Sequence, residues 1–240
     1  MKITARLNAK YFALAMLFQS RKDIRYYLNG VFVEPHPDGG VIMAATDGYR
    51  LAVFRDENGS IDEARIIRMP KDFRRPALKP TLGVLALFES PTTRGCQAHV
   101  FDATGLSDDS HDLDEIIADV TADRVKWIGA ATYIDGTYPN WRGVVPKMPD
   151  DPCPPSVIGV RGDQIADFQE VATRTTFSTL SIIPSSPGGP MIVRCGDDSF
   201  FGILMPCREG VAFDRAVFPW VLKRAEPEAP SDLVETSEAA

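Results

Sequence analysis

The stretch DIRYYLNGV at residues 23–31, followed by TDGYRLAV at residues 46–53, is the most informative part of this 240-residue chain. The residues around it are rich in valine, isoleucine, tyrosine and phenylalanine, which suit a pleated, half-buried surface. This composition predicts one β-strand over Tyr27–Glu34 and another over Val41–Phe54. Any β-sheet protein can contain such strands, so the rest of the sequence has to narrow the fold.

Two dipeptides in the same stretch indicate turns. Asn29-Gly30 and Asp47-Gly48 both suit backbone positions with a positive φ angle. We therefore expect the strands to be bounded by tight turns at these places.

The composition is that of a soluble globular protein with one or two domains. Hydrophobic residues make up 44% of the chain, and the formal net charge is −7. This charge argues against a protein that coats nucleic acid with its whole surface, but it is compatible with a local basic lining. The chain shows no CxxC pair, no signal-peptide pattern and no apolar run of about 20 residues, so a cytoplasmic setting with free thiols is expected.

Three segments follow one plan, in which a strand leads into an amphipathic helix and then into further strands. In the first segment, a strand over Lys2–Leu7 precedes a helix that Asn8 can cap. The helix face carries Tyr11, Leu14, Ala15 and Phe18. In the second, a strand over Ala64–Met69 precedes a helix that starts near Pro80. That helix is expected to carry Leu82, Leu85 and Phe88 or Glu89, and strands follow over residues 97–101 and 125–134.

The third segment begins at Val157, with Asp163 as the expected helix cap. Its helix face carries Ile165, Phe168, Val171 and Ala172, and strands follow over residues 179–183, 191–195 and 200–205. Five prolines over residues 146–155 disfavour both helix and central strand. The predicted domains are residues 1–148 with two βαβββ units, a proline-rich linker at 149–156, a half or degenerate domain at 157–210, and an extension at 211–240 with an acidic, disordered tail.

Four segments in this order resemble the bacterial DNA polymerase III beta subunit, the sliding clamp. RYYLNG at residues 25–30 and TDGYRL at residues 46–51 resemble the family's RYYLNG and TDGHRL, with Tyr49 in place of the usual His. YPNWRGVVP at residues 138–146 is similar to FPDYRRVLP, and GILMPCR at residues 202–208 is similar to VVMPMR. The resemblance implies an α+β DNA-clamp fold of repeated βαβββ units, with antiparallel sheets outside and helices inside.

The matching chain is shorter than a three-domain clamp. Its start coincides with the family's middle domain, and its last domain is halved. Family rings contain twelve units, so three units per chain would need four copies, whereas a degenerate full last domain would need three.

The resemblance also implies a pocket for partner peptides between the middle and last domains. The matching positions are Leu28, Thr46, Gly48, Tyr49, Arg50, Leu51, Pro139, Val144, Ile203, Met205 and Pro206. A mainly apolar cleft with a flexible methionine suits leucine or phenylalanine anchors. Gly143 replaces a family arginine, which weakens the polar rim. The alternative is that these residues are ordinary core and turn positions.

A second implied surface faces DNA. Lys22, Arg25, Tyr26 and Tyr27 combine cations with aromatic rings, a mixture that holds phosphates and stacks on bases. Arg21 belongs to the same group of cations. Weaker candidates are Lys10, Arg74, Arg75, Lys79 and Arg174. Each of them could equally belong to a solvated charged face.

Catalytic, cofactor and metal sites are not expected. The acidic run at 108–119 resembles a calcium loop superficially, but Leu113 stands where such a loop requires glycine. The three histidines are far apart, and neither HExxH nor GxSxG occurs.

The sequence therefore predicts a clamp-like, non-enzymatic processivity factor. Its expected partners are duplex DNA, a clamp loader, further copies of itself, and polymerase or repair proteins that carry a hydrophobic motif. The alternative is an adaptor or decoy that binds clamp partners without forming a ring. The apolar residues 213–222 could compete for the pocket or cover a sheet edge, or they could form a terminal helix on their own domain.

Overall fold

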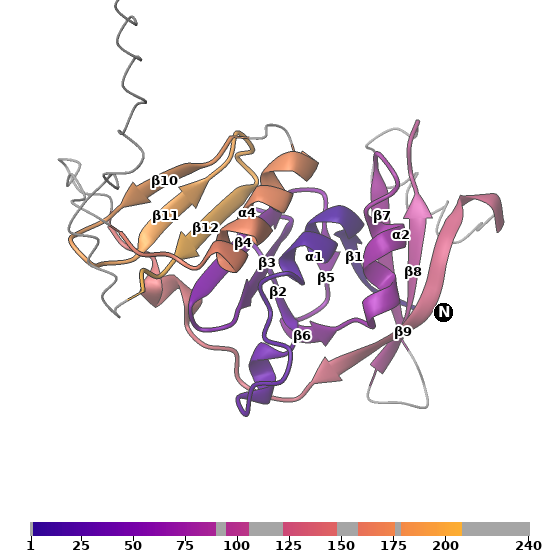
Figure 1. The fold of residues 1–240 in the computed structure, drawn as a ribbon. Helices are drawn as coiled ribbons and strands as arrows, with labels where there is room; N and C mark the ends of the chain where they lie inside the picture. Colours follow the sequence, from indigo (N-terminus) through magenta and orange to yellow (C-terminus); the bar gives the residue numbers. More distant parts are fainter. Residues whose placement is uncertain (1, 90–94, 106–121, 148–157, 176–178, 208–240) are drawn as a thin grey trace, which may run out of the picture. The chain divides into compact units, whose positions relative to one another are not determined.

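The computed structural model describes residues 2–89, 95–105, 122–147, 158–175 and 179–207 (Figure 1). Within these residues the helices are α1 (Ala9–Ala15), α2 (Arg74–Ala77) and α4 (Gly162–Thr175), and the 3₁₀ turns are η1 (Tyr26–Leu28), η2 (Lys71–Phe73), η3 (Ala122–Arg124) and η4 (Trp141–Val144). The strands are β1 (Ile3–Asn8), β2 (Val31–Pro35), β3 (Val41–Thr46), β4 (Arg50–Asp56), β5 (Ser60–Ile61), β6 (Arg65–Arg68), β7 (Gly83–Glu89), β8 (Gly95–Asp102), β9 (Val125–Ile134), β10 (Ser181–Pro184), β11 (Met191–Arg194) and β12 (Phe200–Leu204). None of the described helices is long and apolar enough to cross a membrane.

The described strands form one antiparallel sheet in the order β10-β11-β12-β4-β3-β2-β6-β9-β8-β7-β1-β5. Strands β5 and β6 are consecutive in the chain and are separated only by residues 62–64. Strands β6 and β5 stand at the two ends of the series β6-β9-β8-β7-β1-β5, so this short connection keeps the two ends of the series close together. On the other side, β12 continues the sheet from β4, with Ile203 opposite Leu51. The mostly antiparallel fold with few helices agrees with the predicted α+β class.

The main core lies between the helices and one face of the sheet. Asn8 caps α1, as predicted, because its Oδ1 accepts the backbone N–H of Tyr11 at 3.1 Å. Phe12 packs edge-on against Phe73, and Phe18 packs against Phe168 of α4 at 4.8 Å between ring centroids. The side-chain alternation of a strand sends the other residues to the opposite face. Two smaller apolar clusters lie there, one over β2, β3, β4 and β12, and one over β7 and β8.

The first predicted strand begins later than expected, at Val31, because residues 26–28 form a 3₁₀ turn. The Asn29 side chain holds the preceding loop, since it accepts the backbone N–H of Asp23 and donates to its carbonyl, both at 3.2 Å. Gly30 does not have a positive φ angle. A Cβ at this position would lie 2.9 Å from Ile66, so glycine is required by the close approach of β6.

The helix predicted from Pro80 to Glu89 is wrong, because residues 83–89 form strand β7. All of this strand except Glu89 is buried, so both faces are apolar and the spacing of Leu82, Leu85 and Phe88 does not distinguish helix from strand. The short helix of this unit lies earlier, at Arg74–Ala77.

Three smaller expectations also change. The segment Val41–Phe54 is two strands, with a turn between them at residues 47–49. Asp163 lies inside the first turn of α4 rather than before the helix. Residues 158–161 do not form a strand. The linker at 149–156, the acidic run at 108–119 and the extension at 211–240 lie outside the described residues, and the domain division stays a prediction.

Candidate functional site

A cavity of about 180 Å³ lies where β4 and β12 meet, and we call it the junction pocket. It is lined by Arg25, Leu28, Thr46, Gly48, Tyr49, Arg50, Leu51, Pro139, Asn140, Trp141, Val144, Ile203 and Met205. The structure thus brings together every residue of the predicted pocket except Pro206. Arg25 had been assigned to a DNA surface, and Asn140 and Trp141 were missed although they adjoin Pro139 in the sequence.

The turn between β3 and β4 shapes one wall of the junction pocket. The Thr46 hydroxyl donates to the carbonyl of Arg50 at 2.6 Å and accepts the N–H of Gly48 at 3.0 Å. Gly48 has a φ of +91°, a conformation that glycine adopts without strain. The backbone N–H of Met205 donates to the carbonyl of Tyr49 at 2.9 Å. The turn is therefore fixed both by its own hydrogen bonds and by the residue that follows β12.

Arg50 connects this wall to the helices. Its guanidinium pairs with Asp47 at 3.0 Å and with Asp167 of α4 at 2.5 Å. It also donates to the carbonyl of Leu17 at 3.0 Å and lies over the Phe18 ring. Only 10% of the Arg50 side chain is exposed. These contacts hold the Arg50 side chain in place, and Arg50 thereby links the turn between β3 and β4 to α4 at the base of the pocket.

The rim is apolar and partly open. Leu28, Leu51 and Ile203 are buried in the floor, whereas Tyr49 is 63% exposed and Val144 is 56% exposed. Exposed apolar side chains beside a cavity are typical of a binding surface. The junction pocket can therefore accept an apolar side chain without a large rearrangement.

Arg25 supplies a cation at the rim. Its guanidinium lies against Gly48, because a Cβ on that glycine would be 3.1 Å from Arg25 Nη2. The hydrogen bonds from Arg25, including one of 2.6 Å from Nη2, lower the pKa of Asp23 to about 2. The pair therefore stays ionised over the whole neutral range.

The other predicted DNA-facing residues surround this arginine. Lys22 and Tyr26 are exposed, and Tyr27 is half-buried with its ring 5.8 Å from that of Tyr26. Ile24 between them is 97% exposed. The loop thus presents both cations and apolar groups to solvent.

A group of cations gathers on the helices, and we call it the basic cluster. It consists of Lys71, Arg74, Arg75, Lys79 and Arg174, with Glu170 as the acidic member. Arg74 pairs with Glu170 at 2.6 Å. Four of the weaker sequence candidates lie in this cluster, whereas Lys10 and Arg21 do not line it.

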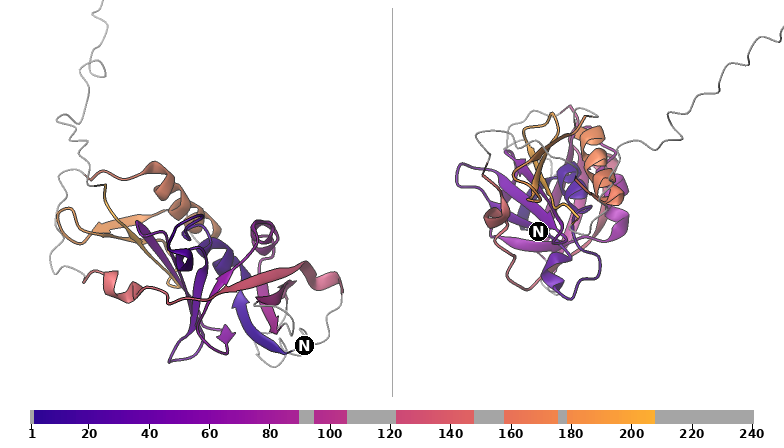
Figure 2. Two further views of the ribbon diagram at one scale, coloured as in Figure 1. Left: turned by 90° about the horizontal axis from the view of Figure 1, so that it is seen from below. Right: turned by 60° about the vertical axis from the view of Figure 1, so that its left-hand side comes forward.

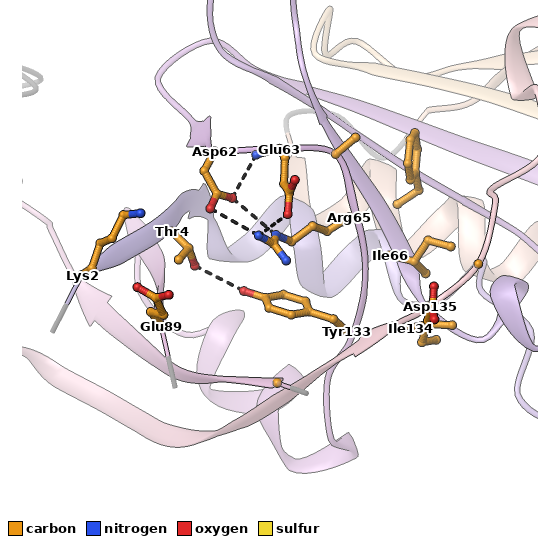
Figure 3. A pocket seen from close by; sticks show the side chains of 14 residues that line it. Lys2, Thr4, Asp62, Glu63, Arg65, Ile66, Glu89, Tyr133, Ile134 and Asp135 are labelled. Atoms are coloured by element: carbon orange, nitrogen blue, oxygen red, sulfur yellow. Dashed lines mark hydrogen bonds and ion pairs between the residues drawn. The ribbon is translucent and has the colours of Figure 1, made fainter. Parts of the chain in front are cut away.

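A second cavity, of about 650 Å³, is polar, and we call it the polar cavity (Figure 3). Arg65 lies in its wall, where it pairs with Asp62 and Glu63 and lies 4.5 Å from the Tyr133 ring centroid. The Tyr133 hydroxyl lies 3.3 Å from that of Thr4, and burial raises the pKa of Tyr133 to about 12. Arg65, Asp62 and Glu63 in this wall therefore already pair with one another.

Metal-binding groups are not assembled in the described part of the chain, where no three His, Cys, Asp or Glu side chains gather. His36 lies in the turn after β2, and His99 packs between Phe88 and Phe101 on β8. His111 lies outside the described residues.

Comparison with known proteins identifies the fold. No protein-family model and no curated protein matches the sequence. Solved structures that match 87% of the chain include the DNA polymerase sliding clamps of Pseudomonas aeruginosa (14% identity, TM-score 0.53) and Bacillus subtilis (12%, 0.55), and the DNA polymerase III subunit beta of Bartonella birtlesii bound to griselimycin (15%, 0.55). This chain covers 68%, 65% and 68% of those chains, respectively. The chain therefore has the fold of the bacterial DNA polymerase III beta subunit, the sliding clamp, in a shortened form.

Proposed function

We propose that this protein is a clamp-like processivity factor that holds polymerase or repair proteins on duplex DNA and catalyses no reaction. The junction pocket carries the proposal, because its apolar floor and open rim suit a short hydrophobic peptide motif. A partner bound through such a motif stays at a high effective concentration near the DNA, and it rebinds before it diffuses away.

The basic cluster supports the DNA part of the proposal. It places five cations and one carboxylate on neighbouring helices, an arrangement that suits phosphates without reading base sequence. A ring of several copies, opened by a clamp loader, would keep the protein on DNA topologically. In that case the protein should be retained on nicked circular DNA and lost after the circle is linearised. Equal loss from both forms would contradict encirclement.

Val144→Asp tests the pocket directly. A carboxylate on this exposed rim residue would have to be desolvated by an apolar ligand, so we expect at least tenfold weaker binding, about 1.4 kcal/mol. The probe is a fluorescein-labelled peptide with leucine and phenylalanine anchors, measured by anisotropy. Val145→Asp is the matched control, since Val145 is adjacent and exposed but does not line the pocket. Equal effects of the two substitutions would place the peptide elsewhere.

A non-encircling adaptor or decoy is the second candidate, because the chain spans only about two thirds of a clamp. It would keep the peptide affinity but would remain a monomer or dimer. Light scattering of the full chain, combined with the circular-DNA assay, separates the two functions.

A further inference from the structure

Glu170 is the one carboxylate among the cations of the basic cluster, in the part of the chain that the structure describes. Helices α2 and α4 lie on the same face of the sheet (Figures 1 and 2), and both contribute arginines to a cavity of about 550 Å³. Asp72, in the neighbouring turn η2, does not line this cavity and accepts a hydrogen bond from Trp127 Nε1 at 3.0 Å. The Glu170 carboxylate therefore faces a positively charged surface.

One oxygen of Glu170 approaches two arginines. Its Oε1 is 2.6 Å from Nη2 of Arg74, on α2, and 3.8 Å from Nε of Arg174, one turn later on α4. The side chains of Arg74, Glu170 and Arg174 are 32%, 33% and 48% exposed. Ion pairs that solvent reaches in this way contribute little to stability, so the Glu170 side chain can leave the arginines at a small cost.

The guanidinium of Arg74 has two donors without acceptors. Its Nε and Nη2 atoms are buried, and neither makes a hydrogen bond within the described residues. The short contact of Nη2 with Glu170 is therefore an ion pair without hydrogen-bond geometry. Nε and Nη2 together form an edge of the guanidinium that can bind two oxygens of one phosphate in parallel. Because buried donors without acceptors cost free energy, such a ligand would be favoured at this edge.

We propose that Arg74 and Arg174 form a site for one phosphate group, and that the carboxylate of Glu170 occupies this site while no phosphate is bound. The carboxylate is tethered beside the arginines, so its effective concentration is high and it competes with phosphate. This inference rests on the proposed function, for which it identifies a phosphate of the DNA backbone as the ligand and Glu170 as the residue that limits its affinity.

Glu170→Gln tests the competition. The amide keeps the size of the side chain but carries no charge, so Arg74 and Arg174 become available to phosphate. We expect a fluorescein-labelled duplex to bind about fivefold more tightly in anisotropy titrations, on the scale of an exposed ion pair. Glu57→Gln is the matched control, since it removes the same charge from an exposed pair with Arg55 outside the cavity. Its effect should stay below about twofold.

Arg74→Lys in the Glu170→Gln background tests the geometry of the site. Lysine keeps the charge but lacks two parallel donors, so most of the gain in affinity should disappear. Arg75→Lys in the same background is the control, because Arg75 lines the same cavity but is exposed. The gain should remain in this variant. Equal losses in the two variants would show that only the total charge matters, and they would overturn the proposed site.

Inorganic phosphate distinguishes a failure of this site from a failure of the proposed function. At constant ionic strength, replacing chloride by phosphate should raise the unfolding temperature of the Glu170→Gln variant more than that of the unchanged chain. This shift without DNA binding would support a site for free phosphate and would count against the proposed function. Equal DNA affinity of both proteins, with equal shifts in phosphate, would overturn the inference and leave the proposed function intact.

Discussion

The polar cavity and the junction pocket differ in a way that their sizes alone do not predict. The polar cavity is the larger, at about 650 Å³, but Arg65 and its carboxylate partners occupy its wall. The junction pocket is about 180 Å³, and its floor is apolar with an exposed rim. A ligand would have to displace existing ion pairs in the first cavity, whereas in the second it would cover apolar surface that is already exposed. The chemistry of the lining therefore favours the smaller cavity as the site for the proposed peptide.

The two cavities also differ in the structural elements that form their walls. The polar cavity lies where β1, β6 and β9 approach the connection between β5 and β6. The junction pocket depends on the contact between β4 and β12 and on the link from Arg50 to α4. Substitutions that weaken this contact should alter peptide binding, whereas substitutions in the polar cavity should alter stability alone.

Arg50→Ala should have the largest effect. It removes ion pairs to Asp47 and Asp167 in a site where the arginine is 10% exposed, so we expect a loss of about 2–3 kcal/mol in unfolding free energy. Urea denaturation measures this loss, and peptide affinity should fall with it. Arg55→Ala on the same strand is the control, since its pair with the exposed Glu57 at 3.6 Å contributes little. Equal losses for both variants would contradict the linking role of Arg50.

Gly48→Ala should have the next largest effect, about 1–2 kcal/mol. The added Cβ is strained at a φ of +91° and also crowds the Arg25 guanidinium, whose Nη2 would lie 3.1 Å from it at the rim. Gly39→Ala separates the two causes, because Gly39 has a φ of +87° with no atom within 4 Å of an added Cβ. Both variants should lose stability in thermal denaturation, but only Gly48→Ala should weaken peptide binding. A matching loss of binding in the Gly39 variant would refute the role of the rim.

The sequence groups the residues around the junction pocket because they lie in short segments with a distinctive residue pattern. The conformation of the Thr46–Leu51 turn is determined by the local residues Thr46, Asp47 and Gly48, so the turn can be predicted from the sequence without knowledge of tertiary contacts. The position of Arg25 was not predictable in this way. Its contact with Gly48 depends on how the η1 loop packs against the turn between β3 and β4.

Secondary structure is harder to predict from the sequence where both faces of a segment are buried. Strand β7 has apolar residues at strand and helix spacing alike, and only its pairing with β1 and β8 determines its conformation. The closeness of β6 to Gly30 is a second tertiary effect, since nothing in Asn29-Gly30 distinguishes a close approach from a turn.

Arg65→Ala tests the other side of the comparison with a smaller expected effect. It removes the pairs with Asp62 and Glu63 and the contact with the Tyr133 ring, which together should stabilise the fold by about 1 kcal/mol. Peptide affinity should stay within twofold of the unchanged protein. A large loss of affinity with stability intact would assign ligand binding to the polar cavity and reverse the comparison.

The dependence of peptide affinity on pH should show the smallest effect. The pKa of Asp23 is lowered to about 2, so the Asp23–Arg25 pair is fully present above the carboxyl's ordinary pKa of 3.8 and is lost only as the pH falls through about 2. No histidine lines the junction pocket, and affinity should therefore be constant from pH 5 to pH 8. Tyr49→His should introduce a two- to threefold loss as the pH falls below about 6.5, because a protonated imidazole on the rim resists burial by an apolar ligand. Anisotropy titrations across this range compare the two proteins. A pH-dependent affinity in the unchanged protein would mean that a titrating group outside this pocket contacts the peptide.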